Sequence, residues 1–569
     1  MIKQMCFQPD LNSQLKIMDI KRTLLWAIFA MSLIMIWDNW QRHEGKPSLF
    51  APKSINQAVA PTGSVNDSSI PVVKGVEKNE VASETSEKLS ENAKNIDVTT
   101  DVIKAQFSTQ GAELRSLELL KHMDTLHPEK NIHLFEMNKD RVYLAQTGLV
   151  GGNGISLPNH KSLMHISSEK FELQPDQNTL EVKFESDEIG GVKLIKTFVF
   201  KKGRYDIDVR HEIVNVGSQP VQPSLYLQLV RDGNKLESAS RFYSTFTGPA
   251  AYNSEEHFKK IEFSDIEKGK SLELGKADNG WIALVQHYFV SAFIPKQSLQ
   301  REVFTKKISD NLYSIGTIIP LVQLEPGATT TIDANLFSGP QEESALEETA
   351  PGLELVKDYG WLTIIAKPLF WLLDKIHGFV GNWGWSIIVL TILIKLMFFP
   401  LSAASYKSMA KMKLVTPKMQ KIKEQYAKDP AKMNQAMMEL YKTEKVNPLG
   451  GCLPIVIQIP VFISLYWVLL ASVEMRNAPW LGWIKDLSTP DPFFILPVIM
   501  AATMFLQTKL NPTPPDPMQA KMMMVMPLVF SVMFFFFPSG LVLYYVVNNT
   551  LSIAQQWQIN KLFGEKKTA

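Results

Sequence analysis

Cysteine is almost absent from this sequence of 569 residues, which contains only Cys6 and Cys452. Two cysteines cannot form a disulfide framework or a cysteine-rich zinc domain, so we expect no metal site. A large excess of one charge is also missing, because the formal net charge is only +2. This balance excludes a strongly basic nucleic-acid-binding chain.

Enzyme motifs are missing as well. The sequence has neither a Walker A loop nor an HExxH motif, and Gly151–Gly154 is typical of a turn because it does not open a helix after a strand. We therefore predict no catalytic residues, no cofactor and no enzymatic activity.

Charge and methionine are unevenly distributed along the chain. Residues 41–350 carry 34 basic and 42 acidic residues, a net charge of −8, so the remainder carries +10. Of the 24 methionines, 16 lie between Met397 and Met533. This split indicates two parts that occupy different solvents.

The N-terminus carries one apolar run. Residues 1–22 are polar and basic. An uncharged apolar run from Thr23 to Trp37 follows and is closed by Asp38, which predicts a hydrophobic segment at 23–40. A cleaved signal peptide and a retained signal-anchor both fit this pattern. We favour the anchor, because Trp37, Trp40 and Arg42 stand where a cleavage site would need small residues. The basic flank predicts a cytoplasmic N-terminus, and Met18 offers an alternative start.

Residues 41–100 are polar and poor in aromatics, which predicts a flexible linker. Residues 101–345 then alternate between apolar and polar with period two, which predicts a large antiparallel β-sandwich. The clearest predicted strands are Val192–Phe200, Tyr205–Val216, Ser224–Val230, Trp281–Ile294 and Thr329–Leu336.

The C-terminal part is dominated by apolar runs. Residues 353–380 are aromatic and amphipathic, which favours an interfacial helix that Pro368 divides in two. Five transmembrane helices are predicted at 385–401, 452–473, 493–508, 522–537 and 540–559. The short turn at Pro538 predicts that the last two form an antiparallel hairpin.

Charge predicts the topology. Residues 402–447 contain ten lysines and four acidic residues, an excess expected of a cytoplasmic loop. The loop 509–521 and the basic tail 560–569 fall on the same side. We thus predict a polytopic membrane protein with six spans, both termini in the cytoplasm and the β-sandwich on the opposite side.

Lys395 is the only charged residue within these predicted spans. A membrane-embedded cation is unfavourable by about 2.5–3.5 kcal/mol on insertion scales. Its amine either snorkels to the inner interface or faces a water-containing cavity, where Thr391, one helical turn earlier, could help to hydrate it.

Other polar residues lie in the third and last spans, among them Gln458, Tyr544, Tyr545 and Asn548. They either form interhelical hydrogen bonds or line a polar groove. The sequence does not decide between these two interpretations.

The loop 402–447 predicts two amphipathic helices, with Asp429 as the N-cap of the second. They either pack on each other or form a landing surface for hydrophobic segments, with lysines available for ribosomal RNA or anionic phospholipid. The residues expected to act there are Lys411, Lys413, Met419, Lys421, Met437 and Met438.

Two blocks are recognisable. KVNPLGGCLPIVIQIPVFISLYWVL at 445–469 and DPMQAKMMMVMPLVFSVMFFFFPSGLVLYYVVNNTLSIAQQ at 516–556 closely resemble the bacterial YidC family of membrane protein insertases. The short basic start after Met18, the predicted β-domain and the lysine-rich loop match the same family. The resemblance covers essentially the whole chain from Met18.

The resemblance implies a function. Members insert hydrophobic segments of nascent proteins into the inner membrane, alone or with the Sec translocon, through a hydrophilic groove that carries one positive charge. It also implies a five-helix core, a periplasmic supersandwich linked to Sec accessory subunits, and no small-molecule substrate. Lys395 occupies the position of the groove charge, which is usually Arg, so a bidentate carboxylate contact is lost. Client contacts map to Ile459, Pro460, Phe462, Tyr544 and Tyr545, and Thr391 matches a groove-lining threonine.

Two other classes compete with an insertase. A secondary transporter or channel would need paired charges or an inverted repeat, and the sequence has one charge and no convincing repeat. A membrane-anchored periplasmic sugar-binding protein would use the spans only as anchors.

Overall fold

A computed structural model describes residues 69–71, 93–124, 127, 129–151, 155–235, 245–272, 274–427, 429–444, 453–511 and 517–564. The predicted cytoplasmic N-terminus with Met18, the anchor at 23–40, most of the linker, and the end of the tail lie outside these residues. The GGNG turn at 151–154 does so as well, except for Gly151.

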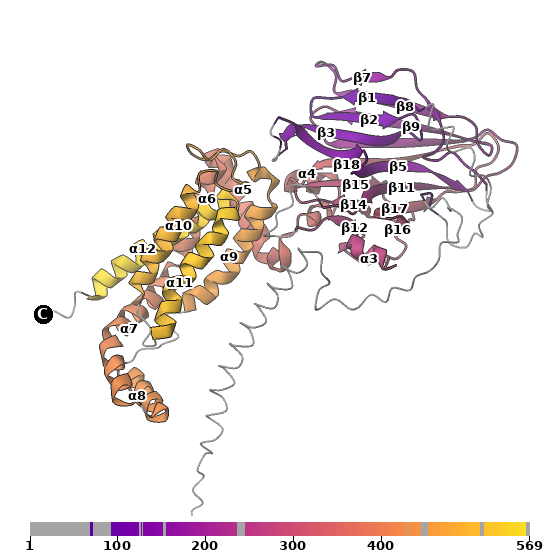
Figure 1. Ribbon diagram of the computed structural model, residues 1–569. Helices are drawn as coiled ribbons and strands as arrows, with labels where there is room; N and C mark the ends of the chain where they lie inside the picture. Colours follow the sequence, from indigo (N-terminus) through magenta and orange to yellow (C-terminus); the bar gives the residue numbers. More distant parts are fainter. Residues whose placement is uncertain are drawn as a thin grey trace, which may run out of the picture. The chain divides into compact units, whose positions relative to one another are not determined.

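Two nine-stranded sheets make up the N-terminal domain (Figure 1). The first sheet contains, in spatial order, β16 (Glu302–Ser309), β17 (Leu312–Pro320), β11 (Pro223–Asp232), β5 (Val142–Gly151), β4 (Asn131–Met137), β3 (Glu113–Met123), β2 (Ile103–Ser108), β1 (Asn95–Thr99) and β7 (Lys170–Glu172). The second sheet contains β13 (Lys259–Lys260), β12 (Gly248–Tyr252), β14 (Trp281–Val285), β15 (Phe289–Pro295), β18 (Thr329–Pro340), β10 (Asp206–Asn215), β9 (Val192–Lys201), β8 (Thr179–Ser186) and β6 (Met164–His165).

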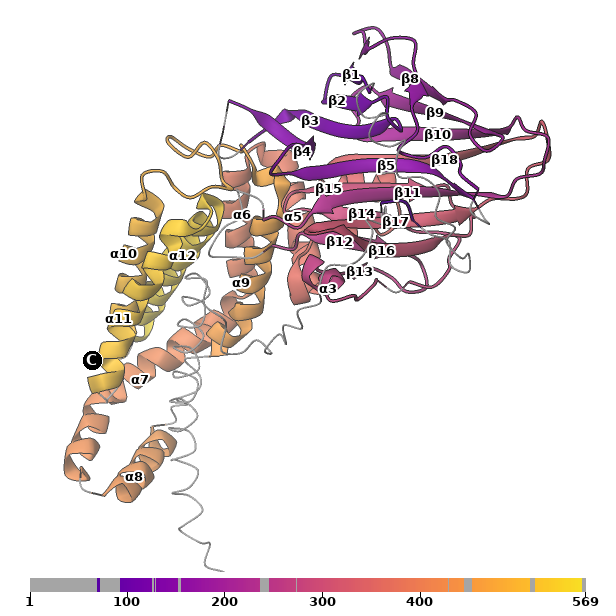
Figure 2. The ribbon, with the colours of Figure 1, turned by 45° about the vertical axis from the view of Figure 1, so that its right-hand side comes forward.

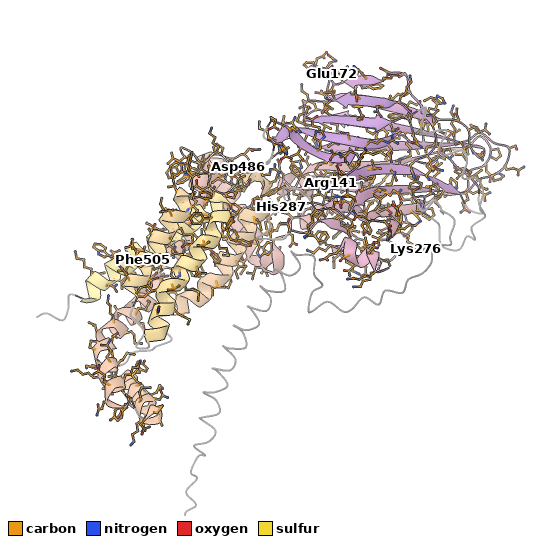
Figure 3. The ribbon with its side chains drawn as sticks, in the orientation of Figure 1. Arg141, Glu172, Lys276, His287, Asp486 and Phe505 are labelled. Carbon is orange, nitrogen blue, oxygen red and sulfur yellow. The ribbon has the colours of Figure 1, made fainter. Side chains whose placement is uncertain are left out.

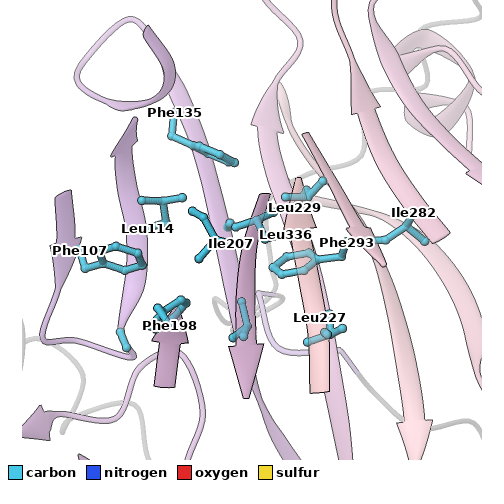
Figure 4. Close-up of a cluster of buried hydrophobic side chains, with 14 of the residues drawn as sticks. Phe107, Leu114, Phe135, Phe198, Ile207, Leu227, Leu229, Ile282, Phe293 and Leu336 are labelled. Carbon is cyan, nitrogen blue, oxygen red and sulfur yellow. The ribbon is translucent and has the colours of Figure 1, made fainter. Parts of the chain in front are cut away.

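The core of this domain lies between the two sheets, where alternate residues of each strand point inward (Figure 4). Phe107 of β2 and Phe198 of β9 come from different sheets, and their ring centres are 4.6 Å apart. Leu225, Leu227 and Leu229 of β11 belong to the same core. Burial of this apolar surface is the main source of stability for the domain.

The predicted strands are present, with two differences. β1 begins at Asn95, inside the segment predicted as linker, because Ile96 and Val98 are fully buried and alternate with more exposed residues. The predicted strand Trp281–Ile294 is two strands, β14 and β15, which pair antiparallel with each other. Both strands are buried along their whole length, so this stretch has no period-two alternation whose interruption would reveal the turn.

A buried lysine joins the two sheets. Lys196 of β9 has no exposed surface, and its amine donates hydrogen bonds to the carbonyl oxygens of Gly111 (2.7 Å) and Thr147 (2.6 Å). His211 on the neighbouring strand lies with Nε2 3.0 Å from the Thr147 hydroxyl. Burial lowers the pKa of Lys196 to about 7, although the negative charge of Glu113 opposes the shift.

Helices form the C-terminal part (Figures 1 and 2). A short helix α3 (Phe263–Glu267) belongs to the β-domain, and α4 (Glu343–Thr349), η1 (Leu353–Val356) and η2 (Gly360–Leu362) follow the last strand. The remaining elements are α5 (Thr363–Val380), α6 (Trp383–Met397), α7 (Phe399–Gln425), α8 (Pro430–Thr443), α9 (Leu453–Ala471), η3 (Val473–Met475), α10 (Ile495–Leu510), α11 (Pro517–Met533), η4 (Phe534–Phe536) and α12 (Ser539–Gly564).

In the described residues, no unbroken helix is both long and apolar enough to cross a membrane. One pair passes together: α6 and α7, which meet at an angle of 67°. Shorter apolar helices cover Gln458–Ala471, Ile495–Leu510 and Lys521–Phe536.

Two local predictions are wrong. α5 continues through Pro368, because a proline lacks only one backbone hydrogen bond and the buried Phe370 and Leu373 hold the next turn in place. The last two helices do turn at Pro538, but α11 and α12 each pack mainly against α10 rather than against each other.

The loop between η3 and α10 is held by an acidic side chain. Asp491 is 1% exposed, and its carboxylate accepts hydrogen bonds from the backbone of Leu496 (2.7 Å) and from the indole of Trp483 (2.9 Å). Asp486, nearby in the chain, accepts from the backbone and hydroxyl of Ser488 (Figure 3). These contacts define where α10 begins.

Because the amine of Lys196 is buried, we predict that the free energy of unfolding of the β-domain increases with pH above 7. The unfolded chain holds this proton up to a pKa of about 10.5, whereas the folded domain releases it near pH 7. Stability should therefore increase as the pH rises from 7 towards 10.5, by at most about 1.4 kcal/mol per pH unit. Lys196→Met should remove this slope in calorimetry of the full chain.

Lys183→Met, on the exposed face of β8, is the matched control and should keep the slope. An equal pH dependence in the Lys196→Met variant would contradict the prediction.

Candidate functional site

Lys395 lies in the last turn of α6 and is 5% exposed. Its amine donates a hydrogen bond to the hydroxyl of Ser552 on α12, at 2.7 Å. Among the residues that the structure describes, no carboxylate lies close enough to form an ion pair with it. The amine therefore points into the helical part instead of extending to its surface, which argues against snorkelling.

Ser552 connects Lys395 to other helices. Its hydroxyl donates to the carbonyl oxygen of Asn548, one turn earlier in α12, at 2.8 Å. The hydroxyl of Tyr406, in α7, is also a hydrogen-bond partner of Ser552. The Gln458 amide on α9 donates to the side-chain oxygen of Asn548 at 2.6 Å. These contacts form a polar seam that joins α6, α7, α9 and α12.

Thr391 does not take part in this seam. It is 1% exposed, and its hydroxyl donates to the carbonyl oxygen of Ile387 in its own helix at 2.6 Å. The two candidate groups on α6 therefore differ: Lys395 makes a contact with another helix, whereas Thr391 satisfies its hydroxyl locally.

A cluster of aromatic rings lies about one helical turn before the seam on α12. The ring centre of Phe462 on α9 is 4.4 Å from that of Tyr545 and 6.2 Å from that of Tyr544. Tyr545 also meets Phe534 of η4 edge-on at 4.6 Å. Tyr544 is almost fully buried, at 2%. These rings pack three elements together.

The two remaining client-contact candidates lie on α9. Ile459 is 46% exposed, so it presents an apolar side chain at the surface of the described part. Pro460 is inside α9, and its carbonyl oxygen accepts a hydrogen bond from Ser464 at 2.8 Å. Ile459 is thus accessible, whereas Phe462, Tyr544 and Tyr545 are engaged with one another.

α7 and α8 pack against each other through their apolar faces. Val415 and Met419 are buried in a cluster with Met412, Met437, Leu440 and Tyr441. Asp429 caps α8 through the backbone amide of Lys432, as predicted. Met438 is 57% exposed. Of the six docking candidates, Met419 and Met437 are thus part of the self-packed hairpin. The exposed ones are Lys411, Lys413, Lys421 and Met438.

Sequence reasoning missed Ser552 and Tyr406. Ser552 carries no charge that would single it out in the last predicted span, and Tyr406 falls in the predicted cytoplasmic loop 402–447. The available signal was spacing: Ser552 is four residues after Asn548 and therefore on the same face of α12.

Family models match most of the chain. The model described as the YidC periplasmic domain covers residues 95–372, and the one described as the 60Kd inner membrane protein covers residues 375–567. The membrane protein insertase YidC of Cupriavidus necator is 57% identical over 558 residues, which is 97% of this chain and 99% of that protein. The chain belongs to the YidC family.

Other relatives agree with this result. The membrane protein insertase YidC of Janthinobacterium sp. strain Marseille is 56% identical over 569 residues, covering 96% of this chain and all of that protein. A crystal structure of an active YidC insertase with its first transmembrane domain resolved covers 81% of this chain and 92% of its own, at 21% identity and a TM-score of 0.37. The family models and the two relatives confirm the predicted family resemblance: a β-rich periplasmic domain precedes a helical C-terminal part.

Because Tyr545 packs against several aromatic rings, we predict that its side chain stabilises the helical part. Tyr545→Ala removes a side chain that contacts Phe462, Phe534 and Tyr544, so the helices should lose packing between α9, η4 and α12. The denaturation temperature of the helical part in detergent should fall. Trp557→Ala, which truncates a 60% exposed ring on the same helix, should leave it nearly unchanged. Equal effects of the two substitutions would contradict this assignment.

Proposed function

We propose that this chain inserts hydrophobic segments of nascent proteins into the bacterial inner membrane, alone or with the Sec translocon. The observation that carries the proposal is the identity of 57% with a membrane protein insertase over 97% of the chain. The buried cation Lys395 and its polar seam supply a physical route for this activity.

The proposed topology has six spans, both termini in the cytoplasm and the β-domain in the periplasm. α6 and α10 contain 15 and 16 residues. At ~1.5 Å per residue each is about 23 Å long, which is shorter than a typical hydrocarbon core of about 30 Å. Such short spans would thin the bilayer around them, at a fraction of a kcal/mol per ångström.

Lys395 is proposed to attract acidic flanks of a client. Its amine has a neutral hydroxyl as its partner, so a client carboxylate could replace Ser552 without separating an ion pair. Two unit charges 4 Å apart attract by about 1 kcal/mol in water and by more in a partly dry site. The seam on α12 would hold the amine in place until that exchange.

The client's apolar segment is proposed to move along α9 and α12 into lipid. Ile459 on α9 is exposed, and Phe462, Tyr544 and Tyr545 pack on one another between α9 and α12. Thr391, Gln458, Pro460 and Asn548 complete the proposed groove. Partition into lipid provides the driving force, roughly 0.3–0.6 kcal/mol for each Leu, Ile, Phe or Val.

The α7–α8 hairpin is proposed as the cytoplasmic docking element. Lys411, Lys413 and Lys421 are exposed and can bind phosphate groups of the ribosome or of anionic phospholipid. Met438 is exposed and available to a hydrophobic client segment. The Sec translocon and its accessory subunits remain proposed partners of the whole chain.

Lys395→Ala should impair insertion of clients with acidic flanks by about fivefold or more, since about 1 kcal/mol of attraction is lost. Lys395→Arg should retain most activity, because the charge remains. A depletion-complementation assay with reporter clients measures both variants.

Lys561→Ala, which removes a lysine near the end of α12, is the matched control and should behave as the parent chain. Clients with neutral flanks form the second control. Full activity of Lys395→Ala with acidic clients would exclude the electrostatic role.

Site-specific crosslinking tests the proposed path. Photoreactive residues at 459, 462 and 544 should react with a stalled nascent membrane protein. The yield should be highest at the exposed position 459 and lowest at the buried position 544. A probe at Trp371, 60% exposed on α5, is the comparison position. Absence of crosslinks at all three α9 and α12 positions would refute the path.

A further inference from the structure

A short piece of the linker lies against the β-domain, far in sequence from the first strand. Before residue 93, the structure describes only Ser69, Ile70 and Pro71. The Gln228 amide donates a hydrogen bond to the carbonyl oxygen of Ser69 at 3.1 Å. A ring nitrogen of His160 lies 3.3 Å from the Ser69 hydroxyl.

These contacts are on the face of the first sheet that points away from the core. Leu225, Leu227 and Leu229 of β11 belong to the core between the sheets. Because side chains alternate along a strand, Tyr226 and Gln228 must point to the opposite face. Both are nevertheless fully buried, so something covers them there.

Apolar contacts complete the covering. Ile70 packs against a separate cluster formed by Val150, Tyr226 and Ile318, with Phe304 beside it. Gly316 makes this arrangement possible, since a Cβ at that position would approach a ring carbon of Phe304 to 2.3 Å. Pro71 is buried next to Ile70.

Buried hydrogen bonds orient the polar groups of this site. The Gln228 amide also donates to the side-chain oxygen of Gln146 at 2.6 Å, and Gln146 is hydrogen-bonded to Glu113. The Tyr226 hydroxyl lies 2.5 Å from Nδ1 of His160. The donors that meet Ser69 are therefore held in position by the sheet itself.

We propose that this face of the first sheet is a docking site for the chain's own linker, with Ser69–Pro71 as its occupant. We call these three residues the linker clasp. The site recognises a backbone carbonyl oxygen through Gln228 and a branched aliphatic side chain through the Tyr226 cluster. Few contacts suffice, because the segment belongs to the same chain and is present at a high effective concentration.

The linker clasp would set the length of the tether to the membrane. With the first span at 23–40, as predicted from the sequence, 28 residues (41–68) separate it from the clasp, whereas 54 residues (41–94) separate it from β1. The maximal reach of the intervening chain falls from about 190 Å to about 100 Å, at ~3.5 Å per residue. The β-domain is then confined closer to the membrane surface.

The test uses the full chain in detergent with the photoreactive residue p-benzoylphenylalanine in place of Phe304. Irradiation should give an intramolecular crosslink to a peptide that contains residues 67–73. Ile70→Asp in this background should reduce the yield about tenfold or more, because a carboxylate is unfavourable in the apolar cluster. Ile55→Asp, the same change elsewhere in the linker, should leave the yield unchanged.

A yield that Ile70→Asp does not change, or crosslinks only between two copies of the chain, would overturn the proposal. If the probe at 304 prevents folding, hydrogen exchange compares the unmodified chain with its Ile70→Asp variant. Faster exchange of peptide 67–73 in the variant supports the clasp, and equal exchange overturns it. Neither result depends on insertase activity.

Discussion

The hydrogen bond between Lys395 and Ser552 is the physical constraint that places a buried amine between α6 and α12. A lysine amine removed from water needs an acceptor, and the described helices provide one hydroxyl in place of a carboxylate. That hydroxyl is itself fixed by the backbone of Asn548, whose side chain accepts from Gln458. These hydrogen bonds link α6, α9 and α12 through side chains that would otherwise be buried without a partner.

The buried lysine of the β-domain has different hydrogen-bond partners from Lys395. The amine of Lys196 donates hydrogen bonds to two backbone carbonyl oxygens, and its burial lowers its pKa to about 7. Lys395 shares its single hydroxyl with Tyr406 and Asn548. The first lysine joins two sheets permanently, whereas the second occupies a site that the proposed function requires to change partners.

Alternation along Val192–Phe200 and Thr329–Leu336 was enough to predict β9 and β18, because strands buried on one face carry a strong period-two pattern. The cap at Asp429 was equally readable. The order of the strands within the two sheets, the burial of Lys196 and the partner of Lys395 could not be predicted, since they depend on residues distant in sequence. The division of 281–294 into two strands failed because continuous burial removes the pattern. Ser69–Pro71 carried no local signal, as their contacts are with β11 and the loop that holds His160.

The junction of α6 and α7 has a mechanical consequence. Only Phe398 separates the two helices, which meet at 67°. Lys395 precedes this corner by less than one turn, and Tyr406 follows it on α7 while sharing Ser552 with the lysine. Because Phe398 is the single residue between the two helices, a displacement of α7 would move the last turn of α6 directly, and with it the contact between Lys395 and Ser552.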